Sequence, residues 1–243
     1  PLWRAGVVQV TLAVSDPGVG ASGIASVCVT TTGGCVALEP GTNGEYATTL
    51  TVPSGTDGAP TISATVTDVA GNSTTVGPVA LKIDRKAPAL TLSTDQVGAW
   101  TNTAVTVTAT ADDGTGSGIG ELCLGDTCDT VNPKTATVDP PPGTFIERTF
   151  NASATDNVGN TTTAGPVTAR VDRAIPTATL SVTPDANADG IYNAGESATA
   201  TFSCADVGSG VASCALFNGA TEVATPSPFT INTSTTGTAS LTV

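Results

Sequence analysis

Residues 185–196 hold the side chains of this sequence that are best suited to bind a metal ion. The segment reads DANADGIYNAGE and matches the calcium-loop pattern D-x-[DN]-x-[DN]-G-x5-E at every specified position. Ca²⁺ takes several oxygen ligands from a loop that curls around it, and we expect the ion to stiffen this connection between two strands. The alternative is an acidic, turn-rich loop that matches by composition. The predicted ligands are the side chains of Asp185, Asn187 and Asp189, the carbonyl of Ile191, Asn193 directly or through water, and both carboxylate oxygens of Glu196.

The six cysteines fall in three close pairs along the chain. This even, local pairing predicts disulfides and an oxidising, extracellular compartment. Zinc is the alternative, but the pairs would lie in separate domains and the sequence contains no histidine to complete a site. The pairs are Cys28/Cys35, Cys123/Cys128 and Cys204/Cys214.

Catalytic chemistry has little support in the sequence. Without histidine or a cysteine outside the three pairs, a nucleophile would need an unusual base, and catalytic carboxylate pairs are not recognisable from spacing. We therefore expect no enzymatic activity. Trp3 and Trp100 have two interpretations, which are stacking on sugar rings or covering a sandwich core or a joint between domains. The sugar-binding alternative predicts that one of these rings is exposed and flat.

The charge of the chain argues against one class of partner. Its net charge is −13, with 21 acidic and 8 basic residues, which is unfavourable for binding the phosphates of nucleic acid. An acidic surface fits cations as partners, and it also keeps an extracellular protein soluble. No apolar run is long enough to span a bilayer and no signal peptide is recognisable, so we expect no membrane span.

The elements that position these residues follow an internal repeat. Residues 65–88 return as residues 153–176 without a gap, at a spacing of 88 residues. A fixed period of this size indicates tandem domains, which we place at residues 1–86, 87–174 and 175–243. Each copy reads as a strand, a D-x-x-G-N turn, a second strand and an Asp-Arg-x-x-Pro linker.

The composition between these motifs predicts an all-β fold. Short runs rich in Val, Ala, Leu, Ile and Thr are interrupted by turn residues about every 8 to 12 positions, which is typical of β-sandwiches. The second strand of each repeated hairpin contains Pro78 or Pro166. Because proline cannot donate to a ladder, we expect this strand to lie at a sheet edge or to carry a bulge.

The third repeat ends differently from the other two. The D-x-x-G-N turn and the last strand that the first two repeats contain are absent from its sequence. Three explanations remain open: an excerpt of a longer protein, a gap filled by a strand from another chain, or a divergent domain that closes differently. The second explanation would make the protein a fibre subunit that assembles by strand donation.

Three motifs give the sequence a family likeness: D-x-x-x-S-G-[IV] at residues 112–119, A-T-D-x-x-G-N at residues 154–160 and V-D-x-x-x-P at residues 171–176. Together they resemble the bacterial immunoglobulin-like (Big-type) tandem repeat domains of secreted and cell-surface proteins. Residues 202–214 resemble the disulfide-bearing version of that repeat. The resemblance implies tandem immunoglobulin-like β-sandwich domains, the third incomplete. It implies no single function, because such repeats form stalks of adhesins, spacers in secreted enzymes and decorations on phage particles.

The resemblance also implies that acidic residues gather at the joints between domains. In an immunoglobulin-like sandwich, the incoming linker meets the loop between the second and third strands and the last hairpin turn. A carboxylate cluster there would bind Ca²⁺ and set the angle between domains. The alternative is that these residues cap turns, with Asp68 and Asp156 accepting hydrogen bonds from backbone amides. The residues that would meet are Asp84, Asp112, Asp113, Asp156 and Asn160 at the first joint, and Asp172 and Asp206 at the second.

These features predict a non-enzymatic structural or adhesive protein of the cell surface. It would be a stalk or filament segment of immunoglobulin-like repeats, stiffened by Ca²⁺ and disulfides. Its expected partners are other copies or neighbouring domains of the same surface protein, and a host or matrix ligand. Two alternatives remain: a self-assembling fibre subunit, and a carbohydrate-binding accessory module of a secreted enzyme.

Overall fold

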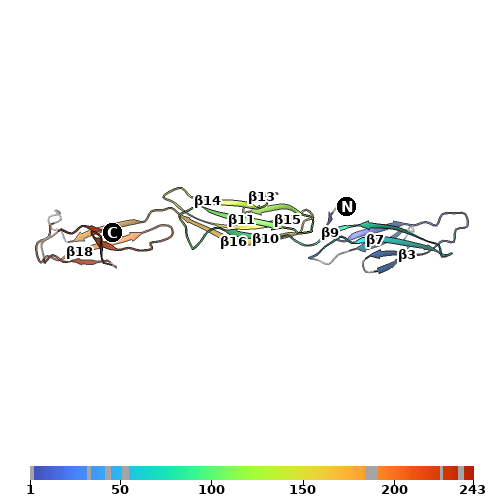
Figure 1. The fold of residues 1–243 in the computed structure, drawn as a ribbon, viewed down its shortest axis with the longest axis horizontal. Coiled ribbons are helices and arrows are strands. Elements are labelled where there is room, and N and C mark those ends of the chain that lie inside the picture. The colour runs from blue at the N-terminus through green and yellow to red at the C-terminus, as the bar shows by residue number, and fades with distance from the viewer. Residues whose placement is uncertain are drawn as a thin grey trace. The chain divides into compact units, whose positions relative to one another are not determined.

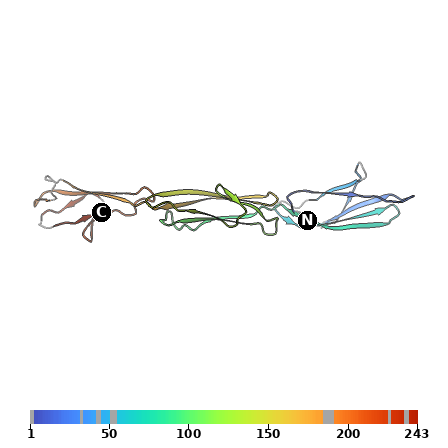
Figure 2. The same ribbon diagram turned by 90° about the horizontal axis from the view of Figure 1, so that it is seen from above.

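The chain is built from β-strands. The computed structural model describes residues 3–31, 34–41, 45–50, 55–183, 191–224, 227–234 and 238–243, and within these ranges no residue lies in a helix. Figure 1 and Figure 2 show the strands as arrows in two views. The prediction of an all-β fold is confirmed. Within the described residues, no helix is long and apolar enough to cross a membrane.

The described part of residues 1–86 forms three sheets. Their strand orders are β1-β9-β6, β2-β5 and β4-β3-β7-β8. Val27, Val29 and Ala64 are buried on one face of the largest sheet. The strands are β1 (Trp3–Arg4), β2 (Val8–Ala13), β3 (Ile24–Thr31), β4 (Gly34–Leu38), β5 (Glu45–Leu50), β6 (Asp57–Gly58), β7 (Thr61–Asp68), β8 (Ser73–Ala80) and β9 (Lys82–Asp84).

Residues 87–174 form two sheets, with the orders β10-β11-β14 and β13-β12-β15-β16. Along β11, Val107, Ala109 and Ala111 are buried while the residues between them are more exposed. Leu122 and Leu124 in β12 are also buried. Two sheets that each bury one face form a β-sandwich. The strands are β10 (Ala89–Thr94), β11 (Val105–Asp112), β12 (Ile119–Leu124), β13 (Thr127–Asp129), β14 (Lys134–Val138), β15 (Phe145–Asp156) and β16 (Thr161–Asp172).

Among residues 175–243, those that the structure describes form two sheets, with the orders β17-β18-β21 and β20-β19-β22. Their core centres on Ala200, Phe202 and Leu216, against which Leu180 and Phe229 pack. The short strand β22 pairs with β19, with Phe217 opposite Thr242. The strands are β17 (Thr177–Thr183), β18 (Ala198–Ala205), β19 (Leu216–Asn218), β20 (Thr221–Ala224), β21 (Phe229–Ile231) and β22 (Leu241–Thr242).

The sheets follow the predicted repeats, because every sheet takes its strands from one of the three ranges above. By compactness the chain divides differently, into two units. The first unit consists of Pro1–Thr94, Val107–Ala136 and Thr149–Val167, and the second of Asp95–Thr106, Thr137–Arg148 and Thr168–Val243. The boundaries at residues 86/87 and 174/175 therefore stay a prediction.

The repeated segment forms the same hairpin twice, as β7-turn-β8 and β15-turn-β16. Both second strands lie at a sheet edge, as Pro78 and Pro166 predict. Strand β8 also carries the predicted bulge, because its register with β7 shifts between Ile62 and Ala64, beside Pro78. In the first turn, Asp68 accepts hydrogen bonds from both the backbone amide and the side-chain amide of Asn72.

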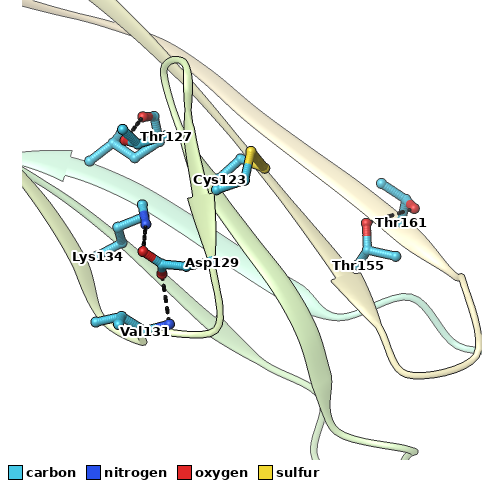
Figure 3. The surroundings of a disulfide bond; sticks show 9 residues. Cys123, Thr127, Asp129, Val131, Lys134, Thr155 and Thr161 are labelled. Carbon is cyan, nitrogen blue, oxygen red and sulfur yellow. Dashed lines mark hydrogen bonds and ion pairs between the residues drawn. A yellow bond between two sulfur atoms is a disulfide. The ribbon is translucent and has the colours of Figure 1, made fainter.

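All three predicted disulfides form, and the described residues contain no free cysteine, so the zinc alternative is wrong. Cys123 and Cys128 face each other across the β12–β13 ladder, with 4.1 Å between their Cα atoms. Nearby, the ammonium of Lys134 pairs with Asp129 at 2.5 Å (Figure 3). Cys28–Cys35 joins β3 to β4, and Cys204–Cys214 joins the end of β18 to the loop before β19.

Candidate metal centre

Three buried carboxylates converge in the first compact unit. One carboxylate oxygen from each of Asp84, Asp113 and Asp156 lies within 4.8 Å of the others. The residues are 0%, 6% and 3% exposed, respectively. Asp84 ends β9, Asp113 directly follows β11 and Asp156 ends β15, so three strand ends supply the cluster. The predicted approach of Asp84 to Asp113 and Asp156 is what the structure shows.

The loop after β11 contains a glycine, Gly116, that leaves room for two of the carboxylates. Asp113 closes this loop on itself, because its Oδ2 accepts a hydrogen bond from the amide of Gly118 at 2.6 Å. A Cβ atom at Gly116 would lie 2.6 Å from Oδ2 of Asp113 and 2.9 Å from Oδ2 of Asp84. Both distances are shorter than a van der Waals contact. Glycine at position 116 is therefore what allows the two carboxylates to lie against the loop.

Asp84 is held by donors from three segments. Its Oδ2 accepts a hydrogen bond from the amide of Ser117 at 2.6 Å, and its Oδ1 accepts one from the amide of Lys86 at 3.1 Å. The side-chain nitrogen of Asn160 also reaches Oδ1, at 3.4 Å. Burial acts to raise the pKa of Asp84, but the hydrogen bonds from Ser117 and Lys86 outweigh it and the net pKa is lowered. Asp84 is thus held as a carboxylate.

Asp156 caps the turn between β15 and β16. Its Oδ1 accepts hydrogen bonds from the amides of Val158 and Asn160, both at 2.9 Å. Its Oδ2 accepts one from the side-chain nitrogen of Asn160 at 2.6 Å. The turn-capping interpretation is therefore confirmed for Asp156, as for Asp68, and Asp156 also belongs to the carboxylate cluster. Asn160 turns its amide nitrogen toward the carboxylates of Asp84 and Asp156.

Asp113 has an oxygen with no donor. Its Oδ2 is bonded to Gly118, whereas its Oδ1 is buried without a hydrogen-bond partner. Buried polar atoms in folded proteins nearly always have a partner, so an orphan of this kind needs an explanation. Burial, and the nearby charges of Asp84 and Asp156, raise the pKa of Asp113 although the Gly118 amide opposes them.

A fourth carboxylate, that of Asp57, lies beside this cluster and was not predicted from the sequence. This residue lies in the short strand β6, directly opposite Asp84 in the β6–β9 ladder. Its Oδ2 accepts a hydrogen bond from the hydroxyl of Thr115 at 3.3 Å, and its Oδ1 is buried without a partner. Burial, followed by the contact with Asp84, raises the pKa of Asp57. Only the pairing of β6 with β9 reveals this neighbour, and no local pattern at position 57 signals it.

The electrostatics of the cluster favour a cation. Like charges separated by about 4.8 Å repel by roughly 3 kcal/mol per pair at an effective dielectric constant near 20. Within the described part of the chain, none of the ion pairs involves Asp57, Asp84, Asp113 or Asp156. A proton or a metal ion would relieve the repulsion, and the orphan oxygens of Asp57 and Asp113 offer lone pairs to either.

The other predicted joint residues lie outside this cluster. Asp112 is exposed, and its Oδ1 accepts a hydrogen bond from the amide of Gly114. In the second compact unit, Asp172 accepts hydrogen bonds from the amides of Ser209 and Ala174. Asp206 bonds the amide of Gly208 at 3.4 Å. Neither Asp172 nor Asp206 belongs to a group of three potential metal ligands among the described residues.

The calcium-loop pattern lies partly outside the described residues. Asp185, Asn187 and Asp189 fall outside them, whereas Ile191, Asn193 and Glu196 are described. Both carboxylate oxygens of Glu196 accept hydrogen bonds from Asn193, at 2.8 Å from its backbone nitrogen and 3.0 Å from its side-chain nitrogen. Calcium binding by this loop stays a prediction.

The two tryptophans are half-buried, and each contacts another side chain. The Lys82 ammonium lies 5.2 Å from the ring centre of Trp3. Trp100 packs edge-on against Phe145, with 6.3 Å between ring centres. The sugar-binding alternative predicts that one of the two rings is exposed and flat. Neither tryptophan is exposed to that degree, and neither is fully buried.

Comparison with known proteins gives structural neighbours only. No protein family and no curated protein matches the sequence. Fibronectin(III)-like modules of Clostridium thermocellum CbhA are 14% identical, with a TM-score of 0.33 over 70% of this chain and 86% of theirs. A 1.5-MDa bacterial ice-binding adhesin, whose structure concerns its own host cell surface retention, is 18% identical, with a TM-score of 0.32 over 94% of this chain and 77% of that chain. The Bacteroides ovatus mixed-linkage glucan protein SGBP-B is 13% identical, with a TM-score of 0.19 over 79% and 49%.

Proposed function

We propose that this chain is a non-enzymatic structural segment of an extracellular protein, a stalk or filament segment of β-sandwich repeats. A Ca²⁺ ion bound by Asp84, Asp113 and Asp156 would stiffen it at the linker that follows β9. The observation that carries the proposal is the buried Oδ1 of Asp113, which has no donor inside a cluster of carboxylates. Three disulfides support an oxidising environment.

The donor set favours Ca²⁺ over other metals. The converging side chains offer only carboxylate oxygens, which suit hard cations, and no imidazole or free thiolate that would favour zinc or copper. Ca²⁺ accepts six to eight oxygens in irregular geometry and completes its shell with water. Mg²⁺ demands a near-octahedral set, which carboxylates already fixed by amides on three separate strand ends are poorly placed to supply.

Binding would have a mechanical consequence within the first unit. Asp84 belongs to the segment that closes β9, whereas Asp113 and Asp156 belong to the loop after β11 and to the β15–β16 turn. The backbone amide of Ser117 and the side-chain nitrogen of Asn160 already join these two segments to Asp84. An ion shared by the three carboxylates would replace their mutual repulsion by attraction and so resist separation of these segments.

The first prediction concerns Asp113→Asn, which keeps the size of the side chain and an acceptor for the Gly118 amide but removes the charge. With Ca²⁺ in about hundredfold excess over Kd, binding stabilises the native chain by about 2.7 kcal/mol, and the variant should lose that stabilisation. In the presence of a chelator the variant should be more stable than the native chain, because it carries one negative charge fewer in a crowded cluster of carboxylates. Thermal unfolding with and without Ca²⁺, together with calorimetric titration, measures both effects.

Asp112→Asn is the matched control, because Asp112 is the neighbouring residue, is exposed and lies outside the cluster. It should bind Ca²⁺ like the native chain. Equal Ca²⁺ affinity in the native chain and Asp113→Asn would contradict the proposed site.

A second prediction concerns the calcium-loop pattern and is independent of the first. Asp185→Ala combined with Glu196→Ala should reduce the calorimetric stoichiometry by one Ca²⁺ ion and remove part of the chelator-induced fall in unfolding temperature. Asp113→Asn should leave this loop site unaffected. An unchanged stoichiometry in the double variant would assign residues 185–196 to the compositional alternative.

A further inference from the structure

The two linkers of the chain share one arrangement, although they lie in different compact units. Asp84 accepts a hydrogen bond from the amide of Ser117, and Asp172 accepts the equivalent bond from the amide of Ser209. Beside each serine lies a glycine, Gly116 or Gly208, whose added Cβ would collide with the linker carboxylate. Asp84 and Asp172 are 88 residues apart, and the receiving glycines and serines are 92 residues apart, so the two loops match in sequence although the distance along the chain differs.

The backbone contacts of the two linkers also match. Gly55 donates to the carbonyl of Arg85, and Gly143 donates to the carbonyl of Arg173, both at 2.9 Å. In return the amide of Arg85 bonds Thr56, and the amide of Arg173 bonds Thr144. The two linkers therefore make the same backbone hydrogen bonds, and they differ in the side chains around the aspartate.

The difference lies in the loop that receives the aspartate. When residues 112–119 are aligned with residues 204–211 without a gap, Asp113 corresponds to Ala205. The carboxylate with an orphan oxygen at the first linker is thus replaced by a methyl group at the second. Asp206 takes the position of Gly114, and its Oδ1 accepts a hydrogen bond from the amide of Gly208.

Asp172 itself has a donor on each oxygen. Ala174 donates to Oδ1 at 2.9 Å, and Ser209 donates to Oδ2. Hydrogen bonds from Ser209, the largest cause, lower the pKa of Asp172, as expected for a carboxylate stabilised by amides. Arg173, the next residue, also pairs with Asp139 at 2.5 Å. No orphaned buried oxygen was found at Asp172 or Asp206 within the described residues.

From this contrast, and building on the proposed function, we propose that the chain contains one Ca²⁺-controlled linker and one cation-independent linker. Residues 84–88 are held by Ca²⁺ through Asp84, Asp113 and Asp156. Residues 172–176 are held without a metal ion, by backbone amides and by the Arg173–Asp139 ion pair, and keep their arrangement when Ca²⁺ is withdrawn. A fall in Ca²⁺ would release the first linker and leave the second in place.

Trypsin distinguishes the two linkers in one reaction, because it cleaves after basic residues, which are Arg85 and Lys86 in the first linker and Arg173 in the second. Lys86 is exposed in the first linker, and Arg173 is half-buried in the second. Cleavage of a folded protein follows the population of locally opened chain when opening and closing are fast. The rate of cleavage after Lys86, divided by the rate after Arg173, therefore reports their relative opening and cancels any effect of Ca²⁺ on the protease.

The decisive comparison is made in saturating Ca²⁺, so that the predicted loop at residues 185–196 stays loaded. Asp113→Asn should raise the ratio of cleavage after Lys86 to cleavage after Arg173 by roughly tenfold. This corresponds to a roughly tenfold larger equilibrium population of the opened first linker. Asp112→Asn should leave the ratio unchanged. Asp172→Asn should act on the other linker, accelerating cleavage after Arg173 to the same extent with Ca²⁺ and with chelator.

The outcomes separate this inference from the proposed function. If calorimetry shows the same Ca²⁺ stoichiometry for the native chain and Asp113→Asn, the proposed function fails and the inference fails with it. If Asp113→Asn loses one ion but cleavage after Arg173 rises as much as cleavage after Lys86, only the inference is overturned. Should Asp113→Asn fail to fold, chelator added to the Asp185→Ala, Glu196→Ala chain tests the same ratio, and a constant ratio there overturns the inference.

Discussion

Gly165→Ala is expected to lower the local unfolding free energy of the β15–β16 hairpin by about 3 kcal/mol. Gly165 has a φ of +118°, which costs an L-residue roughly 1–2 kcal/mol. Its Cβ would also lie 3.0 Å from the carbonyl oxygen of Phe150 and 3.2 Å from the Cα of Asn151, and relieving such overpacking costs about 1–3 kcal/mol. Backbone atoms of the central strand β15 have little freedom to move away.

Gly159→Ala in the same hairpin separates the two contributions. Gly159 has a φ of +97°, but nothing lies within 4 Å of the position its Cβ would take. This variant should therefore cost only about 1 kcal/mol. Because a chain of two compact units need not unfold in one step, native-state hydrogen exchange of the β15 and β16 amides is the suitable measurement. Equal losses in both variants would show that the contact with β15 contributes nothing.

The same constraint explains why Gly-Pro recurs in the repeat. At Gly77, which corresponds to Gly165 at the spacing of 88 residues, an added Cβ would lie 2.7 Å from the carbonyl oxygen of Ile62 and 3.0 Å from the Cα of Ser63. The glycine permits close approach of the neighbouring strand, and the following proline suits an edge strand. The two copies thus preserve one backbone geometry.

Local patterns were sufficient to predict the hairpins, their edge strands and the disulfides. The Asx turn at Asp156 needs only residues within one segment, and Cys123 and Cys128 lie five positions apart on two paired strands. The edge position of β16 follows from the missing amide of Pro166. Each of these features is determined by neighbours along the chain, which is why sequence periodicity and turn chemistry capture it.

The features that could not be predicted from local sequence depend on pairing between strands that are far apart along the chain. Asp57 meets Asp84 only because the two-residue strand β6 pairs with β9, and nothing in the surrounding loop sequence specifies that pairing. The convergence of Asp84 with Asp113 and Asp156 was predicted through the resemblance to a known sandwich, not through spacing. Asp112, one position before Asp113, was predicted with equal weight, yet β11 ends between them and Asp112 remains exposed.

Gly116→Ala is expected to produce a large loss of Ca²⁺ affinity although it removes none of the proposed ligands. Its Cβ would occupy space 2.6 Å from Oδ2 of Asp113 and 2.9 Å from Oδ2 of Asp84, so both carboxylates must move at once. The hydrogen bonds that orient them, from Gly118 and Ser117, would weaken with that movement. Loss of orienting contacts alone typically reduces metal affinity by roughly tenfold to hundredfold, and displacement of two ligands should reach at least the upper end of that range.

Gly114→Ala is the control, and it sharpens the interpretation. Gly114 lies in the same loop with a φ of +57°, and nothing lies within 4 Å of the position its Cβ would take. Alanine there strains the loop without entering the cluster, so it should reduce stability modestly and change Ca²⁺ affinity little. Gly116 has no such positive φ, so any loss on its substitution reflects the filled space. If calorimetric titration gave Gly116→Ala and Gly114→Ala the same affinity, close packing of the carboxylates on this loop would have no part in binding the ion.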